Sequence, residues 1–107
     1  MRVAVVDDEP SHLALTRGLL ERMQYECLPF LDGKSFLPNV KPDAFDLLII
    51  DWQLPDLSGP EIVRHVRRDL GPRLPILFVT NRSGEQDIVE GLAAGADDFM
   101  VKPLRIA

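Results

Sequence analysis

Short apolar runs alternate with longer amphipathic segments along the chain. Four such runs, rich in Val, Ile and Leu, cover residues 3–6, 47–50, 76–79 and 99–101. None of them alternates polar with apolar positions. A strand that is apolar on both faces belongs in the interior of a parallel sheet with helices on either side. The pattern therefore predicts an α/β fold.

The segment after the first run carries the signals of a helix. Pro10 suits the first turn, where the missing backbone N–H needs no partner, and we expect the helix to continue to about Met23. Leu15, Leu19 and Met23 repeat at every fourth position. This spacing predicts that they form the inner face of the helix.

Two further helices are predicted in the second half of the chain. Pro60 opens one that stops at the pair Gly71-Pro72. Ser83 and Gln86 form a capping box for the other, which Gly95 closes. The inward residues of the first are Ile62, Val63, Val66 and Leu70, and the apolar residues that follow the capping box are Ile88, Val89 and Leu92.

The region between residues 25 and 40 has a weaker pattern. Residues 26–29 indicate an edge strand, because Pro29 has no N–H to donate within a central ladder. A short helix is expected around residues 34–38.

Composition bounds the kind of protein. The chain has 107 residues, 46% of them hydrophobic and 27% charged, which fits one globular domain and leaves no room for a second. With 12 Lys and Arg against 17 Asp and Glu, the net charge is -5, which disfavours nucleic-acid binding by this chain. A single cysteine, Cys27, excludes an internal disulfide, and the apolar runs are too short for a membrane span. We expect a cytoplasmic chain that binds no membrane.

Polar residues that carry chemistry follow the four predicted central strands. Asp7 and Asp8 follow the first, Asp51 the second, Thr80 the third and Lys102 the last. The carboxyl ends of parallel strands meet at one edge of a sheet, where α/β folds place their sites. Loops after strands are commonly polar, and that explanation serves for any one of these positions. It serves poorly for all of them together.

Three carboxylates gathered at one edge need a compensating cation, because they repel by about 4 kcal/mol per pair at an effective dielectric constant near 20. Oxygen ligands with few neighbours favour Mg²⁺, with Mn²⁺ as an alternative. Lys102 and the hydroxyl of Thr80 would meet the oxygens of a phosphoryl group, which is the charge neutralisation that phosphoryl transfer requires. Asp51 is then the carboxylate nucleophile.

Four segments together resemble the signatures of response regulator receiver domains, and they span nearly the whole chain. They are VVDDE at residues 5–9, DWQLPDLSG at 51–59, VT at 79–80 and GADDFMVKP at 95–103. The resemblance implies a flavodoxin-like three-layer sandwich whose five parallel strands lie in the order 2-1-3-4-5. It also implies that Asp51 accepts a phosphoryl group from a histidine kinase or phosphotransferase protein.

The same resemblance assigns roles at the site. Asp8 and Asp51 would ligate Mg²⁺ directly, the backbone carbonyl of Gln53 would be a further ligand, and Asp7 would act mainly through water. Lys102 would pair with Asp51 and then with its phosphate.

A switch is implied as well. Thr80 would move toward the phosphoryl group, Phe99 would follow as the switch aromatic, and the bond before Pro103 would be cis. Phe99 replaces the tyrosine of many relatives and cannot donate a hydroxyl hydrogen bond. Asn81 stands where the family prefers a small residue, so we expect it to slow the entry of a phosphodonor or of water.

Several other residues have simpler explanations. His12 and His65 lie in helical patterns without a second ligand at suitable spacing, and we expect surface roles for both. The arginines at 64, 67, 68 and 73 are expected to form a solvated helix face rather than a partner site. Trp52 adjoins Asp51 and is the only tryptophan, so we expect it to pack beside the site and to report on the metal.

Receiver domains normally end with a helix after the Lys-Pro loop, and this sequence stops four residues after Pro103. We therefore expect residues 1–107 to be a receiver domain cut from a longer regulator and lacking that last helix. The apolar sheet surface left open, at about 25 cal/mol for each Å² in contact with water, predicts a homodimer or a segment-swapped oligomer.

Three functions fit the pattern to different extents. The favoured one is a signalling switch rather than an enzyme, which assists its own Mg²⁺-dependent phosphorylation and regulates an output domain, with a DNA-binding transcriptional effector outside this chain as one form of output. A metal-dependent phosphatase would need a general acid two residues after the nucleophile, where Gln53 stands, and a covering cap. A receiver-shaped module that is never phosphorylated is disfavoured by the intact acidic pair, Thr80 and Lys102.

Overall fold

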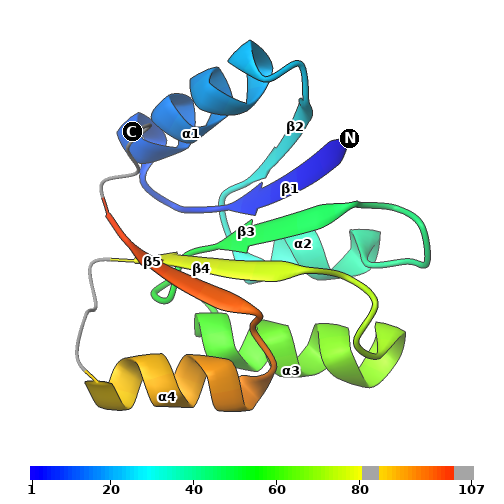
Figure 1. The fold of residues 1–107 in the computed structure, drawn as a ribbon, viewed down its shortest axis with the longest axis vertical. Coiled ribbons are helices and arrows are strands. Elements are labelled where there is room, and N and C mark those ends of the chain that lie inside the picture. Colours follow the sequence, from blue (N-terminus) through cyan, green and yellow to red (C-terminus); the bar gives the residue numbers. More distant parts are fainter. Residues whose placement is uncertain (81–84, 103–107) are drawn as a thin grey trace.

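The computed structural model describes residues 1–80 and 85–102, and its centre is a parallel sheet. Five strands pair in the order β2-β1-β3-β4-β5, as the resemblance implies (Figure 1). Their bounds are Arg2–Val6 for β1, Glu26–Phe30 for β2, Leu47–Ile50 for β3, Ile76–Thr80 for β4 and Asp98–Val101 for β5. The predicted α/β class and the edge position of the strand that contains Pro29 are confirmed.

Helices cover both faces of the sheet. Helix α1 spans Pro10–Arg22, α2 Gly33–Phe36, α3 Gly59–Leu70 and α4 Glu85–Ala94, with a 3₁₀ turn at Leu37–Asn39. Figure 1 shows α1 on one side of the sheet and α3 and α4 on the other. The longest described helix, α1, has 13 residues, and none of the described helices is long and apolar enough to cross a membrane.

Two apolar clusters fill the spaces between these layers. The larger lies under α2, α3 and α4 and contains Phe36, Ile62, Val63, Val66, Leu48, Ile50 and Phe78, all fully buried. The smaller lies under α1 and contains Val3, Val5, Leu20, Ile49 and Val79. The inward face predicted for α3 is confirmed at Ile62, Val63 and Val66, and the helix ends at Gly71, whose φ of 68° favours glycine.

The inner face predicted for α1 is wrong. Leu15 and Met23 are 42% and 54% exposed, whereas His12, Thr16 and Leu20 are buried against the sheet. Both rows repeat every fourth residue. The buried row begins with the polar residues His12 and Thr16, so its apolar pattern is weaker than that of the row with Leu15 and Met23. Thr16 can be buried because its hydroxyl donates to the carbonyl oxygen of His12 over 3.0 Å.

Three sequence-based expectations lie outside the described residues. They concern the capping residue Ser83, the side chain of Asn81 and the peptide bond before Pro103. Gly95, expected to close α4, does follow its last residue Ala94 and has a φ of 122°.

Candidate functional site

The chemistry-bearing residues meet at the carboxyl edge of the sheet because main-chain hydrogen bonds extend past the strand ends. The N–H of Asp7 donates to the carbonyl oxygen of Phe30 over 3.0 Å, and that of Asp51 donates to Val6 over 2.9 Å. Across β4 and β5, the N–H of Lys102 donates to the carbonyl oxygen of Thr80 over 2.8 Å. These bonds fix the backbone from which each side chain departs.

Lys102 is the cation of this site. Its ammonium nitrogen lies 3.0 Å from Asp51 Oδ2, 3.3 Å from Asp7 Oδ2 and 3.4 Å from Glu9 Oε2, and its side chain is only 6% exposed. Glu9 was not singled out from the sequence, although it directly follows the acidic pair. Lys102 therefore neutralises part of a cluster that would otherwise be strongly repulsive.

Three carboxylates form the acidic part. Asp7, Asp8 and Asp51 each offer an oxygen within 4.8 Å of the others, with Asp7 and Asp51 buried and Asp8 exposed. Oxygen donors in this number are what Mg²⁺ or Mn²⁺ binds, and the open side at Asp8 leaves room for waters and for a phosphate oxygen. The donor set therefore fits a divalent cation of this kind.

The two central groups have shifted pKa values. Burial raises the pKa of Asp51 above its ordinary value of 3.8, and the nearby charge of Asp7 adds to this, while the hydrogen bond and charge of Lys102 act in the opposite direction. Burial alone would lower the pKa of Lys102, but its hydrogen bonds and its attraction to Asp51 and Asp7 raise it above 10.5. The surroundings of Asp51 thus disfavour its ionised form compared with a carboxylate in water.

Gln53 lies two residues after Asp51, in the loop between β3 and α3. Its backbone N–H donates to the carboxylate of Asp51, which lowers the pKa of that group, and its side chain is exposed. Two hydrogen bonds fix the end of the loop next to α3. The N–H of Gly59 donates to the carbonyl oxygen of Trp52 over 2.6 Å, and the Ser58 side chain caps α3 by accepting from the N–H of Glu61.

Asp56 fastens the same loop to α2, a contact that the sequence did not indicate. Its Oδ1 accepts from the N–H of Gly33 over 2.9 Å, and its Oδ2 accepts from the N–H of Lys34 over 2.7 Å. The partners are more than 20 positions away in the sequence, so no local spacing could predict them.

An aromatic cluster lies beside Asp51. The ring of Trp52 lies 5.3 Å from that of Phe78 and 6.2 Å from that of Phe99, measured between centroids, and Trp52 is 6% exposed. The expectation that Trp52 packs next to the site is confirmed. Phe99, the expected switch aromatic, is half-buried in the same cluster, and Thr80 is buried at the end of β4.

The surface role predicted for His12 is wrong. Its side chain is 7% exposed, and its Nδ1 lies 2.5 Å from Asp7 Oδ2. The sequence offered only a weak signal, namely that His12 stands on the same helical row as Thr16 and Leu20. His65, in contrast, is half-buried on α3 and contacts Arg68.

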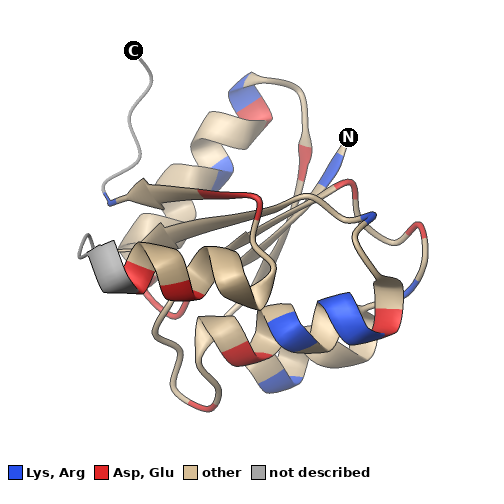
Figure 2. Ribbon diagram, turned by 60° about the horizontal axis from the view of Figure 1, so that its bottom comes forward, with Lys and Arg blue, Asp and Glu red and all other residues tan. Residues whose placement is uncertain are grey.

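The solvated arginine face is only partly confirmed. Figure 2 shows basic segments along α3, which contains Arg64, Arg67 and Arg68. Arg67 is 17% exposed and donates to the carbonyl oxygens of Gly95 and Leu74 over 2.8 and 2.6 Å. It joins α3 to the loops that precede β4 and β5 and is not a free surface charge.

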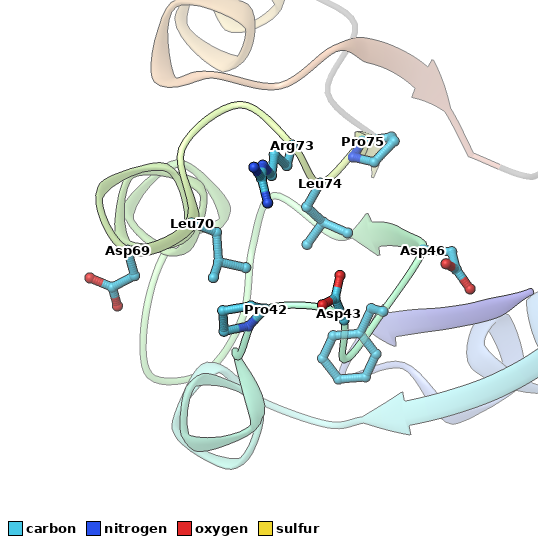
Figure 3. Close-up of a pocket in the computed structure, with 9 residues that line it drawn as sticks. Pro42, Asp43, Asp46, Asp69, Leu70, Arg73, Leu74 and Pro75 are labelled. Atoms are coloured by element: carbon cyan, nitrogen blue, oxygen red, sulfur yellow. The ribbon is translucent and has the colours of Figure 1, made fainter.

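A pocket of about 380 Å³ lies at the opposite edge of the sheet, before the starts of β3 and β4 (Figure 3). Its walls come from two segments and are formed by Pro42, Asp43, Phe45 and Asp46 and by Asp69, Leu70, Arg73, Leu74 and Pro75. Neither the acidic triad, which consists of Asp7, Asp8 and Asp51, nor Lys102 lines it, so the pocket does not belong to the site described here.

Comparison with known proteins agrees with this geometry. The family model of the response regulator receiver domain matches residues 3–107. The chain is 43% identical to the phosphate regulon transcriptional regulatory protein PhoB of Rhizobium meliloti, over 95% of this chain and 45% of that protein. It thus spans less than half the length of the curated relatives first matched.

Solved structures lead to the same family. A CheY-like response regulator receiver domain protein from Methanospirillum hungatei superposes with a TM-score of 0.88 at 30% identity, over 97% of this chain and 82% of that one. The response regulator DrrB of Thermotoga maritima gives a TM-score of 0.85 at 33% identity, over 96% of this chain and 46% of that one. With the strand order 2-1-3-4-5 and the CheY-like flavodoxin fold, the chain belongs to the response regulator receiver domain family.

Proposed function

We propose that this receiver domain is a phosphorylation-dependent switch in which Asp51 accepts the phosphoryl group. The observation that carries the proposal is the contact of Lys102 with Asp51 at 3.0 Å, beside two further carboxylates. It brings a nucleophile, a cation and a metal-binding oxygen set to one place, as phosphoryl transfer requires.

The metal would be held by residues of the acidic triad. Asp8 and Asp51 would ligate Mg²⁺ or Mn²⁺ directly, the backbone carbonyl of Gln53 would add a ligand, and Asp7 would act through water. When bound, the cation neutralises charge on the phosphoryl oxygens and on the carboxylates. This assignment is supported by the exposed position of Asp8 and by the full engagement of Asp7 with protein donors.

In the transfer, a carboxylate oxygen of Asp51 bonds to phosphorus while the bond from phosphorus to the donor nitrogen of a histidine kinase or phosphotransferase protein breaks. The nitrogen leaves with the bonding pair. Lys102 neutralises the phosphoryl oxygens, and the Thr80 hydroxyl donates a hydrogen bond to one of them. The contact of Lys102 with Asp51 supports this role.

Thr80 and Phe99 would carry the signal away from Asp51. Phe99 pairs across β4 and β5 with Phe78, and its ring contacts Trp52, which follows the phosphoacceptor. A movement of Thr80 toward the phosphate would open space for the Phe99 ring at the end of β4. The cis bond before Pro103 and the slowing effect of Asn81 stay predictions.

The partners follow from the same proposal. A histidine kinase or phosphotransferase would supply the phosphoryl group in the cytoplasm, and an output domain would read the switch. One curated relative is named a transcriptional regulatory protein, which supports a DNA-binding output outside this chain.

Self-association also stays a prediction. It is supported by the exposed apolar side chains of Val89, Leu92, Met100 and Val101, and a clean monomer by light scattering at high concentration would count against it.

Mass spectrometry after incubation with acetyl phosphate and Mg²⁺ tests the proposal. We expect one labile phosphoryl adduct that is absent in Asp51→Asn and retained in Asp69→Asn, which changes an exposed carboxylate on α3 in the same way. An adduct of equal yield in Asp51→Asn would overturn the assignment. Fluorescence of Trp52 during a MgCl₂ titration reports metal binding independently, because its ring packs beside the site.

A further inference from the structure

His12 is a buried polar residue that the roles above leave unexplained. It lies in the first turn of α1, under which the sheet carries the apolar residues of the smaller cluster. Its Nδ1 is 2.5 Å from Asp7 Oδ2, and the two side chains are 7% and 4% exposed. The contact joins α1 to the acidic triad.

The chemistry of the pair sets the direction of this hydrogen bond. An ionised carboxylate only accepts, so Nδ1 of His12 carries the hydrogen and donates it to Asp7. The second oxygen of Asp7, Oδ1, accepts from the N–H of Glu9 over 2.9 Å, and Lys102 lies 3.3 Å from Oδ2. Donors on both oxygens therefore fix the orientation of this carboxylate.

The other ring nitrogen shows that packing alone does not call for an imidazole. Nε2 of His12 is buried, and among the described residues it has no hydrogen-bond partner. A buried polar atom without a partner weakens a fold, and a leucine of similar size would avoid this cost. The polar contact that the histidine does make is directed at Asp7.

We propose that His12 is a positioning residue for the metal site: by holding the carboxylate of Asp7, it sets the affinity of the acidic triad for Mg²⁺. The inference rests on the proposed function, in which Asp7 faces the cation through water. A carboxylate released from His12 can turn away from its neighbours Asp8 and Asp51, which repel it, and the charge that attracts the cation then spreads out. Partners of this outer kind commonly change metal affinity about tenfold or more when removed.

Three substitutions at His12 separate this role from packing. His12→Leu removes the donor and keeps the volume. His12→Asn keeps a donor, since the amide nitrogen of asparagine occupies the place of Nδ1, whereas His12→Gln moves the donor to the place of Nε2. Thr16→Val is the matched control, because Thr16 is 1% exposed on the same helical row and its hydroxyl donates to the backbone carbonyl oxygen of His12 within α1.

The measurement is the dissociation constant for Mg²⁺, from Trp52 fluorescence during a MgCl₂ titration, together with thermal unfolding in EDTA. We expect His12→Leu and His12→Gln to raise the dissociation constant about tenfold, and His12→Asn and Thr16→Val to stay near the wild-type value. His12→Leu should unfold in EDTA at a temperature no lower than the wild type.

Each other result overturns a stated claim. Equal Mg²⁺ affinity in His12→Leu and the wild type would remove the positioning role and leave the proposed function intact. The same conclusion would follow if His12→Asn bound Mg²⁺ as weakly as His12→Leu. If His12→Leu fails to fold, the comparison of His12→Gln with His12→Asn decides instead. A wild-type protein that binds no Mg²⁺ would overturn the metal part of the proposed function itself, and the inference with it.

Discussion

The ammonium nitrogen of Lys102 lies 3.0 Å from Oδ2 of Asp51, although 51 positions separate them in the chain. They follow strands β5 and β3, which are not neighbours, so the side chain of Lys102 reaches across the end of β4. Without a bound metal ion, the positive charge of Lys102 therefore offsets the charges of the buried carboxylates of Asp7 and Asp51.

Replacing Lys102 by methionine should destabilise the fold at pH 7. The long apolar stem is kept, but two buried carboxylates lose their cation, and breaking a buried pair in this way costs roughly 3 kcal/mol. Urea unfolding in EDTA measures the loss. Lys41→Met, at an exposed position before β3, is the control and should change the free energy of unfolding by less than about 0.5 kcal/mol. Equal losses in the two variants would contradict the role of Lys102.

Asp56 gives a pH-dependent prediction. Its slight burial would raise its pKa, but the backbone N–H groups of Gly33, Lys34 and Leu57 outweigh this and hold the pKa below its ordinary value of 3.8. Because the folded pKa is lower than the unfolded one, this group stabilises the fold above pH 3.8, and the contribution is lost as the pH falls through the folded value.

Asp56→Asn should therefore lower the free energy of unfolding at pH 7 by roughly 1 kcal/mol, the usual cost of losing a charged cap at backbone N–H groups. The difference from the wild type should shrink below pH 3.8. Thermal unfolding across this pH range measures it, with Asp69→Asn as the control on an exposed carboxylate. A difference that grows toward low pH would show that the sign is wrong.

The sequence predicts most of this fold because its strands are apolar on both faces and its helices carry strong boundary signals. Pro60 and Gly71 bracket α3 closely, and Pro29 marks the edge strand. The strand-end argument brings Asp7, Asp51 and Lys102 together without a structure, because parallel strands share one carboxyl edge.

What the sequence could not predict involves polar residues whose partners lie outside their own element. His12 is a polar residue on a buried row of α1, and its partner Asp7 follows β1. Asp56 and Arg67 look like surface charges, yet Asp56 accepts from Gly33 and Arg67 donates to Gly95, which lie 23 and 28 positions away. Spacing within one element carries no information about such contacts.

Gly59 should tolerate no side chain. A Cβ there would lie 2.6 Å from the carbonyl oxygen of Asp51 and 2.6 Å from Cε1 of Phe78, and the backbone of Asp51 cannot yield without moving the site. We expect Gly59→Ala to cost about 1–3 kcal/mol, as overpacking of a core does. It should also reduce the yield of the acetyl phosphate adduct.

Gly18 is the matched control for this substitution. It lies in α1, and a Cβ there would meet nothing within 4 Å. Gly18→Ala should stabilise the protein by roughly 0.5–1 kcal/mol, because alanine loses less backbone entropy in a helix. Urea unfolding of both variants gives the comparison, and changes of the same sign would contradict the close approach at Gly59.

Arg67 provides the last prediction, which concerns the link between α3 and the loops that precede β4 and β5. Its guanidinium donates to the carbonyl oxygens of Gly95 and Leu74 and pairs with Asp97 at 2.9 Å, and Oδ2 of Asp97 also accepts from the N–H of Ile76. Arg67→Met keeps the stem that packs against Gly95 but leaves these carbonyl oxygens without their donor. We expect a loss of about 2–4 kcal/mol in the free energy of unfolding.

Arg64→Met is the control one turn earlier, where the side chain is exposed. It should change the free energy of unfolding by less than about 0.5 kcal/mol. Amide hydrogen exchange adds a local readout. If Arg67 joins α3 to the start of β4, its loss should speed exchange at Ile76 and Asp97, whose N–H groups are paired there. The effect should be smaller at Val5, on β1. Uniform acceleration at all three positions would mean that Arg67 contributes only to global stability.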